Sequence, residues 1–137
     1  MKPIDQRYFA PPEGDCWIAC IASILERPIE QFDEVHRLHT EKARDWYERG
    51  CPANGFEWDP VLASLHRVGV HPTWMVEPCT VVPHGYAIAS GQSPRGDWLH
   101  AVVAHYGAQV HDPHPSRDGL AGPVIDWCVL VPVETKP

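Results

Sequence analysis

The sequence predicts an α+β fold, with helices in the first half of the chain and an antiparallel β-sheet in the second half. Three observations support this prediction. The chain has 137 residues, 44% of them hydrophobic, which suffices for a single domain over residues 1–137 with its own core. Apolar residues recur at helical spacing in the first half. Short β-rich runs follow in the second half.

The helical half begins with residues 16–26 (CWIACIASILE), which are apolar almost all round and therefore suit a buried helix. Asp15 is the expected N-cap of this helix, and Pro28 stops it. Further amphipathic helices are predicted over residues 29–38, residues 40–49 up to Gly50, and residues 58–68 up to Gly69.

The second half contains β-rich runs that Gly, Pro, Asp and Ser residues separate. Helices that precede the strands, rather than alternate with them, indicate an antiparallel sheet, and we expect the first helix to pack on it. The predicted strands cover residues 72–77, 86–90, 98–105, 108–112 and 126–133.

Charge and hydropathy exclude several classes of protein. The chain has 11 basic and 18 acidic residues, a net charge of −7, and no basic run, so we expect neither nucleic acid nor a membrane surface as partner. The acidic balance favours basic or neutral partners. The longest apolar run, residues 17–22, is too short to span a membrane, and the first 15 residues lack the apolar core of a secretory signal. A cytoplasmic location is therefore expected, while the oligomeric state stays open.

Five cysteines are scattered along the chain with no CxxC pair, which predicts neither a disulfide framework nor a structural zinc site. Cys20 and Cys128 lie in apolar runs and are expected in the core, whereas Cys51 and Cys79 have no partner at a recognisable spacing. We expect no cofactor. The alternative is a transition-metal protein that uses the nine histidines, for example His111 and His114.

Cys16 stands in the first turn of the predicted apolar helix. A helix N-terminus stabilises negative charge, so the position predicts a lowered pKa for the Cys16 thiol and a reactive thiolate. The free backbone N–H of Cys16 can also stabilise an oxyanion. These features suit a nucleophile, although a lone cysteine can equally be a small buried residue.

A base for this nucleophile is found in residues 98–112 (WLHAVVAHYGAQVHD). If a hairpin turn is centred on Tyr106, His100 faces Asp112 directly, and Asp112 can orient the imidazole. A turn centred half a residue later shifts this pairing by one residue. The alternative to a catalytic pair is a cross-strand His–Asp pair on the protein surface. Trp98 would share the sheet face of His100, and His111 would point to the opposite face.

The stretch Gly14-Asp15-Cys16-Trp17, followed by Leu-His-Ala-Val-Val at 99–103 and Val-His-Asp-Pro at 110–113, resembles the papain-like cysteine peptidases. It is most similar to bacteriocin-processing (double-glycine leader) peptidase domains and their stand-alone bacterial or phage relatives. The resemblance implies a papain-like fold with Cys16 as nucleophile, His100 as base and Asp112 as orienter. It also implies Gln6 as an oxyanion donor. More residues separate Gln6 from Cys16 than in the family pattern, and a looped-out turn would have to absorb them.

The expected function is thiol-dependent hydrolysis of an amide or peptide bond in a peptide or protein substrate, through a thioester at Cys16. A deamidase or an acyltransferase would use the same site, and an inactive papain-like binding module is the alternative from a different class. The remaining histidines are expected to be solvated: His36, His39, His66, His71, His84 and His105.

Overall fold

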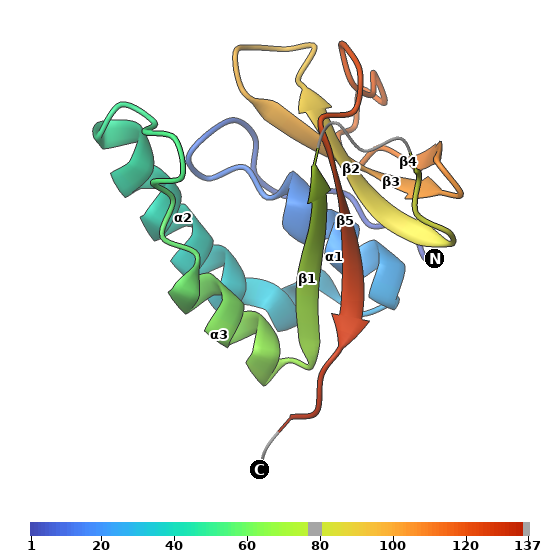
Figure 1. Ribbon diagram of the computed structural model, residues 1–137, viewed down its shortest axis with the longest axis horizontal. Helices are drawn as coiled ribbons and strands as arrows, with labels where there is room; N and C mark the ends of the chain where they lie inside the picture. Colours follow the sequence, from blue (N-terminus) through green and yellow to red (C-terminus); the bar gives the residue numbers. More distant parts are fainter. Residues whose placement is uncertain (77–80, 136–137) are drawn as a thin grey trace.

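The computed structural model describes residues 1–76 and 81–135. Helix α1 (Cys16–Leu25), the 3₁₀ helix η1 (Ile29–Phe32), α2 (Asp33–Glu48) and α3 (Asp59–Arg67) come first along the chain. The strands follow as β1 (Val70–Val76), β2 (Tyr86–Gln92), β3 (Leu99–His105), β4 (Ala108–His111) and β5 (Asp126–Pro132). The helices pack on the sheet (Figure 1), so the α+β class is confirmed.

All the strand pairs are antiparallel, in the order β1-β5-β2-β3-β4. The last strand, β5, therefore lies between β1 and β2, one strand in from the β1 edge of the sheet (Figure 1). Successive residues of β2 and β3 are buried, because the helices cover one face and the segment after β4, with Leu120 and Val124, covers the other. Each predicted strand is present within about two residues of its predicted ends.

Helix α1 lies against the sheet because its residues are apolar on almost every side. Ile18 and Ile21 are fully buried and belong to one cluster with Ile88, Ala101 and Val103 of β2 and β3. This packing places the first residue of the helix, Cys16, at the side of β3.

The second helical region differs from the sequence prediction. Residues 29–38 and 40–49 were expected to form two helices, but a short 3₁₀ helix leads into the single helix α2 over residues 33–48. No glycine or proline interrupts residues 33–48, so the backbone hydrogen bonds continue. Val35 and Ala43 are buried on one side of this continuous helix. Gly50 and Gly69, both with positive φ, follow the ends of α2 and α3 as predicted.

Asp15 precedes α1 but does not cap it with its side chain, contrary to the sequence prediction. Its buried carboxylate instead accepts hydrogen bonds from the backbone N–H groups of Arg7 and Tyr8, both at 3.0 Å. The Arg7 guanidinium lies 3.5 Å from the same carboxylate. The Asp15 side chain therefore fixes the N-terminal segment against the start of α1 and does not cap the helix.

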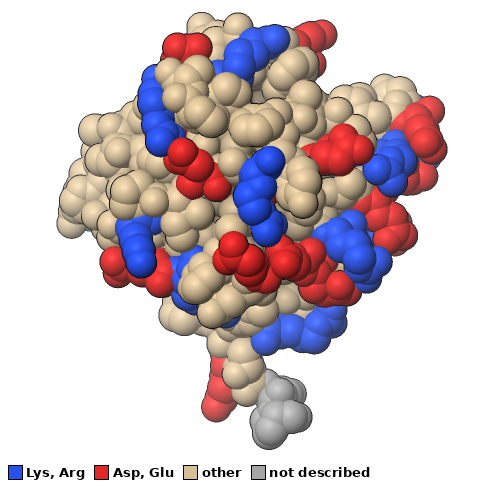
Figure 2. Space-filling view, turned by 180° about the vertical axis from the view of Figure 1, so that it is seen from behind, with Lys and Arg blue, Asp and Glu red and all other residues tan. Residues whose placement is uncertain are grey.

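Charges of both signs are interspersed on the molecular face shown in Figure 2. Exposed ion pairs include Arg37 with Glu34, within α2, and Arg49 with Asp45, at the C-terminal end of α2. Exposed pairs contribute little to stability. Within residues 1–76 and 81–135, no helix is long and apolar enough to cross a membrane.

Asp15→Ala should lower the free energy of unfolding by about 1–3 kcal/mol, because it leaves two backbone N–H groups without their acceptor. Asp15→Asn keeps an acceptor oxygen and should lose less. Urea denaturation checks both values. Asp5→Ala is the matched control: it removes a half-exposed carboxylate from the same segment and should cost no more than about 1 kcal/mol. Equal losses for Asp15→Ala and Asp5→Ala would contradict the role given to Asp15.

Candidate active site

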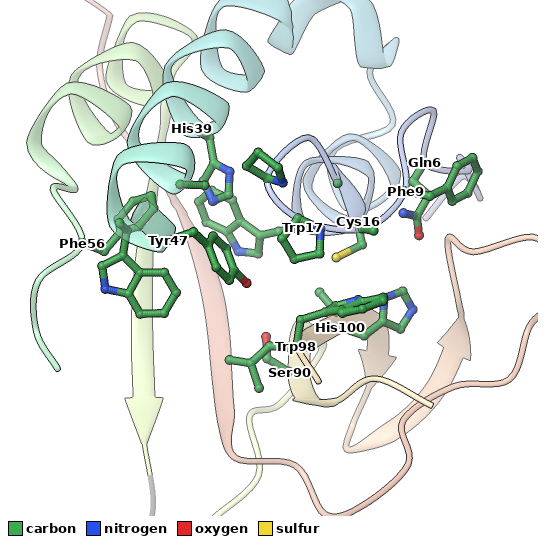
Figure 3. A pocket seen from close by; sticks show the side chains of 18 of the residues that line it. Gln6, Phe9, Cys16, Trp17, His39, Tyr47, Phe56, Ser90, Trp98 and His100 are labelled. Carbon is green, nitrogen blue, oxygen red and sulfur yellow. The ribbon is translucent and has the colours of Figure 1, made fainter. Parts of the chain in front are cut away.

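A cavity of about 680 Å³ lies beside the N-terminus of α1. Cys16, His100 and Gln6 all line it, and Figure 3 shows them around one end of the cavity. Asp112 does not line the cavity and lies buried in contact with His100. The structure thus brings together the four residues that the sequence singled out.

His100 and Asp112 form a buried hydrogen bond. Nε2 of His100 donates to Oδ1 of Asp112 at 2.7 Å, and the two side chains are 2% and 0% exposed. Because Asp112 holds Nε2, the second ring nitrogen, Nδ1, is the one that can exchange a proton with a substrate or a nucleophile.

The hairpin that carries the two residues begins with the alternative of the two registers considered, in which the pairing is shifted by one residue. Its turn is centred between Tyr106 and Gly107, both with positive φ, and His105 pairs with Ala108. An irregularity after this pair places Val103 opposite His111. Asp112 was expected to be the cross-strand partner of His100. It is not: it contacts His100 from the bend that follows β4.

Asp112 accepts two further hydrogen bonds, from the backbone N–H of His114 at 2.9 Å and of Gly119 at 2.7 Å. Burial opposes ionisation of this carboxyl, but the hydrogen bonds from His100, His114 and Gly119 outweigh it and lower the pKa of Asp112 below its ordinary value. Asp112 is thus a carboxylate that cannot rotate away from His100.

Burial also lowers the pKa of His100, and the hydrogen bond and charge of Asp112 offset this only in part. The positive charge of Arg95 acts in the same direction as burial. The imidazole is therefore neutral near pH 7, with a lone pair on Nδ1 that can accept a proton.

The Cys16 thiol points into the cavity, on the side where the rings of Trp98 and His100 lie (Figure 3). The lowered pKa expected from the helix N-terminus is wrong: burial raises the pKa of Cys16 to about 11. Hydrogen bonds from the backbone N–H groups of Ala101 and Trp17 favour the thiolate but do not compensate. The surroundings are dense although part of Cys16 stays accessible, so the desolvation of the sulfur outweighs the helix N-terminus.

Gln6 lies next to Cys16 despite the extra residues between them. Gly14 donates to the carbonyl oxygen of Ala10 at 2.8 Å and Asp15 to that of Tyr8 at 3.5 Å, so residues 9–14 loop out. The backbone N–H of Gln6 donates to the Pro113 carbonyl at 3.0 Å, which ties it to the bend after Asp112. One hydrogen of Gln6 Nε2 is donated to Tyr8 O, and Figure 3 places the amide beside Cys16, away from Trp17.

The histidines next to Asp112 have structural partners. His111 points away from His100, is 8% exposed and donates from Nε2 to the carbonyl of Ile4 at 2.9 Å. His114 accepts the N–H of Ser116 on Nδ1. Within residues 1–76 and 81–135, no three His, Cys, Asp or Glu side chains are grouped as metal ligands would be.

The other cysteines largely follow the sequence prediction. Cys20 and Cys128 are fully buried, as expected. These two, together with Cys16 and Cys51, are free thiols, and Cys79 lies outside the described residues.

Sequence reasoning missed the aromatic wall of the cavity. Five of the six tryptophans line it: Trp17, Trp46, Trp58, Trp74 and Trp98. Trp98 packs on Gly96, where an added Cβ would lie 1.9 Å from the indole. The one available signal was the excess of tryptophan in a short chain.

His39 also belongs to this wall and is only partly exposed, with Nδ1 buried, rather than solvated as expected. Its ring lies among Trp17, Phe56 and Trp58, with centroids 5.3–6.1 Å apart. Burial, with a smaller contribution from His36, lowers the pKa of His39 to about 4. His39 is therefore neutral at pH 7.

The chain matches no protein-family model, and neither a curated protein nor a solved structure matches it significantly. The interpretation of the site thus depends on the geometry described above.

His39→Phe should flatten the dependence of stability on pH. The folded pKa of His39 lies below its ordinary value near 6.5, so the unfolded chain binds more protons and stability falls as the pH falls from 6.5 towards 4. The wild-type protein should lose up to about 3 kcal/mol more than His39→Phe between pH 7 and 4. Urea denaturation at several pH values measures the difference. If the free energy of unfolding depended on pH in the same way in both proteins, the neutral state of His39 would be contradicted.

Alkylation of Cys16 by iodoacetamide should follow the raised pKa. Below a pKa of about 11 the thiolate fraction grows tenfold per pH unit, so the rate should rise about 100-fold from pH 7 to 9. Peptide mapping after timed labelling gives the rate at this one cysteine, and His100→Ala should show the same slope. A rate that is flat from pH 5 to 8 and falls in His100→Ala would instead indicate a thiolate–imidazolium pair.

Proposed function

We propose that the protein is a papain-like cysteine hydrolase that cleaves an amide or peptide bond in a peptide or protein substrate. One observation carries the proposal: the buried His100–Asp112 hydrogen bond stands at the same cavity as a cysteine that opens a helix. A nucleophile, a base and a group that orients the base are the parts that thiol-dependent acyl transfer needs.

In the first half-reaction, the substrate carbonyl lies over the Cys16 sulfur. Because the thiol and the imidazole are both neutral at pH 7, Nδ1 of His100 takes the thiol proton as the sulfur–carbon bond forms. The carbonyl oxygen becomes an oxyanion. Helix α1 begins at Cys16, so the Cys16 N–H has no acceptor within the helix and can bind the oxyanion, together with the second hydrogen of Gln6 Nε2.

The tetrahedral intermediate then collapses. The His100 imidazolium, stabilised by the Asp112 carboxylate, gives its proton to the leaving amine as the carbon–nitrogen bond breaks, and a thioester remains at Cys16. Water then attacks the thioester, with His100 as base, and the acid is released with regeneration of the thiol.

The acyl acceptor and the amide decide between related activities. If an amine attacks the thioester in place of water, the protein is an acyltransferase, and if the amide is a glutamine side chain, it is a deamidase. An inactive binding module would keep the cavity without turnover. These outcomes differ in their products, so one experiment separates them.

Incubation with a proteome-derived peptide mixture, followed by mass spectrometry, should reveal new peptide termini that are absent with Cys16→Ser. Acid quenching should trap an acyl adduct on the peptide that contains Cys16. Glutamine converted to glutamate would indicate a deamidase, and peptide–amine adducts would indicate an acyltransferase. No product of any kind, and no adduct, would overturn the proposal.

The side chains should differ in their effects on turnover. His100→Ala and Asp112→Asn should each lower kcat by about 10²–10⁴-fold, because proton transfer loses its base or the base its orientation. Gln6→Ala should cost about 10²–10³-fold if its amide binds the oxyanion. Two control variants should retain activity. Cys20→Ala removes a buried thiol one turn further along α1, and His66→Ala removes an exposed imidazole of α3. Turnover by His100→Ala at the wild-type rate would contradict the assigned roles.

A further inference from the structure

The cavity extends from Cys16 along a continuous series of aromatic rings. Trp17 stacks on Trp74 at 5.9 Å, Trp74 lies 4.8 Å from Trp58, and Trp58 lies 4.5 Å from Phe56. Trp46 continues the series at 6.3 Å from Phe56. The proton transfers proposed for Cys16 and His100 use none of these rings, so they need another explanation.

Buried polar atoms without a protein partner lie on the same cavity. Oε1 of Gln6, Nδ1 of His39 and Oδ1 of Asp126 are buried, and none has a hydrogen-bond partner within the part of the chain that the structure describes. Native structures leave few such atoms, and a ligand that supplies donors is one explanation. All three can accept a hydrogen bond. Within the described residues, the fourth buried atom without an oxygen or nitrogen partner, Nε1 of Trp17, is a donor and interacts with the sulfur of Cys128.

The position of Asp126 links Cys16 to the aromatic wall. Asp126 begins β5 and lies opposite Ser90 of β2, which in turn lies opposite Ala101 of β3. Directly paired residues share a sheet face, so Asp126 stands two strands from Ala101, whose N–H contacts the Cys16 sulfur. Trp74 pairs with Cys128, which makes it a diagonal neighbour of Asp126 on that face.

Among residues 1–76 and 81–135, no Lys or Arg side chain forms an ion pair with Asp126. Burial raises the pKa of Asp126, and a hydrogen bond with Ser90 compensates only in part. Arg95 is the one Lys or Arg that lines the cavity within the described residues. Its guanidinium donates to Ser116 Oγ at 3.0 Å, and its charge lowers the pKa of His100 and of His114. Arg95 therefore lies at the His100 end of the cavity, away from Asp126.

We propose that the part of the cavity between Cys16, Asp126 and the aromatic wall binds a long basic side chain, Arg or Lys, that neighbours the amide attacked by Cys16. This inference rests on the proposed function. The aromatic faces attract the cation and cover its stem, while the free oxygen of Asp126 accepts its N–H. An apolar side chain would leave that oxygen unpaired. The neutral His39 does not repel the cation, and the acidic chain favours it.

Binding can be measured without turnover, because the tryptophans of the wall report on the cavity. Cys16→Ser protein is titrated with N-acetyl-arginine amide and with its neutral isostere, N-acetyl-citrulline amide, while tryptophan fluorescence is followed. The arginine compound should bind at least about tenfold more tightly. In Asp126→Asn the two should bind equally, whereas Asp97→Asn, which removes an exposed carboxylate at the cavity, should keep most of the preference.

Equal binding of the two compounds to Cys16→Ser protein, tighter binding of N-acetyl-norleucine amide, or no fluorescence change up to the solubility limit would each overturn this inference. The comparison of ligands needs no substitution at Asp126, so it remains decisive if Asp126→Asn does not fold. Selective binding of the arginine compound by a protein without hydrolytic products would overturn the proposed function alone. Hydrolysis without that selectivity would overturn only the inference about the basic side chain.

Discussion

The carboxylate of Asp112 is a charge inside the protein, and an isolated charge there would cost several kcal/mol. It is stable because His100 and the backbone N–H groups of His114 and Gly119 all donate to it. These hydrogen bonds fix the bend after β4, and the segment that follows it, with Leu120 and Val124, covers one face of the sheet. The same bend accepts the N–H of Gln6 at Pro113, and Arg117 joins the bend to Asp5 by an ion pair at 2.6 Å. The orientation of His100 and the place of Gln6 therefore depend on one buried carboxylate.

Burial decides the protonation states around this carboxylate. It raises the pKa of Cys16 and lowers that of His100, so at pH 7 the site holds a thiol and an imidazole rather than an ion pair. In the proposed mechanism, the cost of separating charge is met only when a carbonyl is attacked and the oxyanion donors are engaged. The proposed mechanism therefore transfers the proton in concert with attack. It also means that the reactivity of Cys16 belongs to the whole site and not to the helix N-terminus.

The sequence predicted those features that depend on local patterns. The apolar run after Asp15 specifies α1, and Tyr106-Gly107 specifies the hairpin that brings His100 near Asp112. The register could not be derived, because the irregularity between Val103 and Ala104 shifts it and Asp112 acts from beyond the strand. The aromatic wall could not be predicted either, because Trp17 of α1, Trp58 just before α3 and Trp74 of β1 meet only through tertiary packing.

The tautomer of His100 is the most direct test of the central claim, that Asp112 presents Nδ1 of His100 as the base. Long-range ¹H–¹⁵N NMR of the imidazole at pH 7.5 should show a proton on Nε2, shifted downfield by Asp112, and a Nδ1 without a proton. Asp112→Asn should lose the downfield proton and populate both tautomers. A wild-type His100 that carries its proton on Nδ1, or that is fully protonated at this pH, would contradict the account.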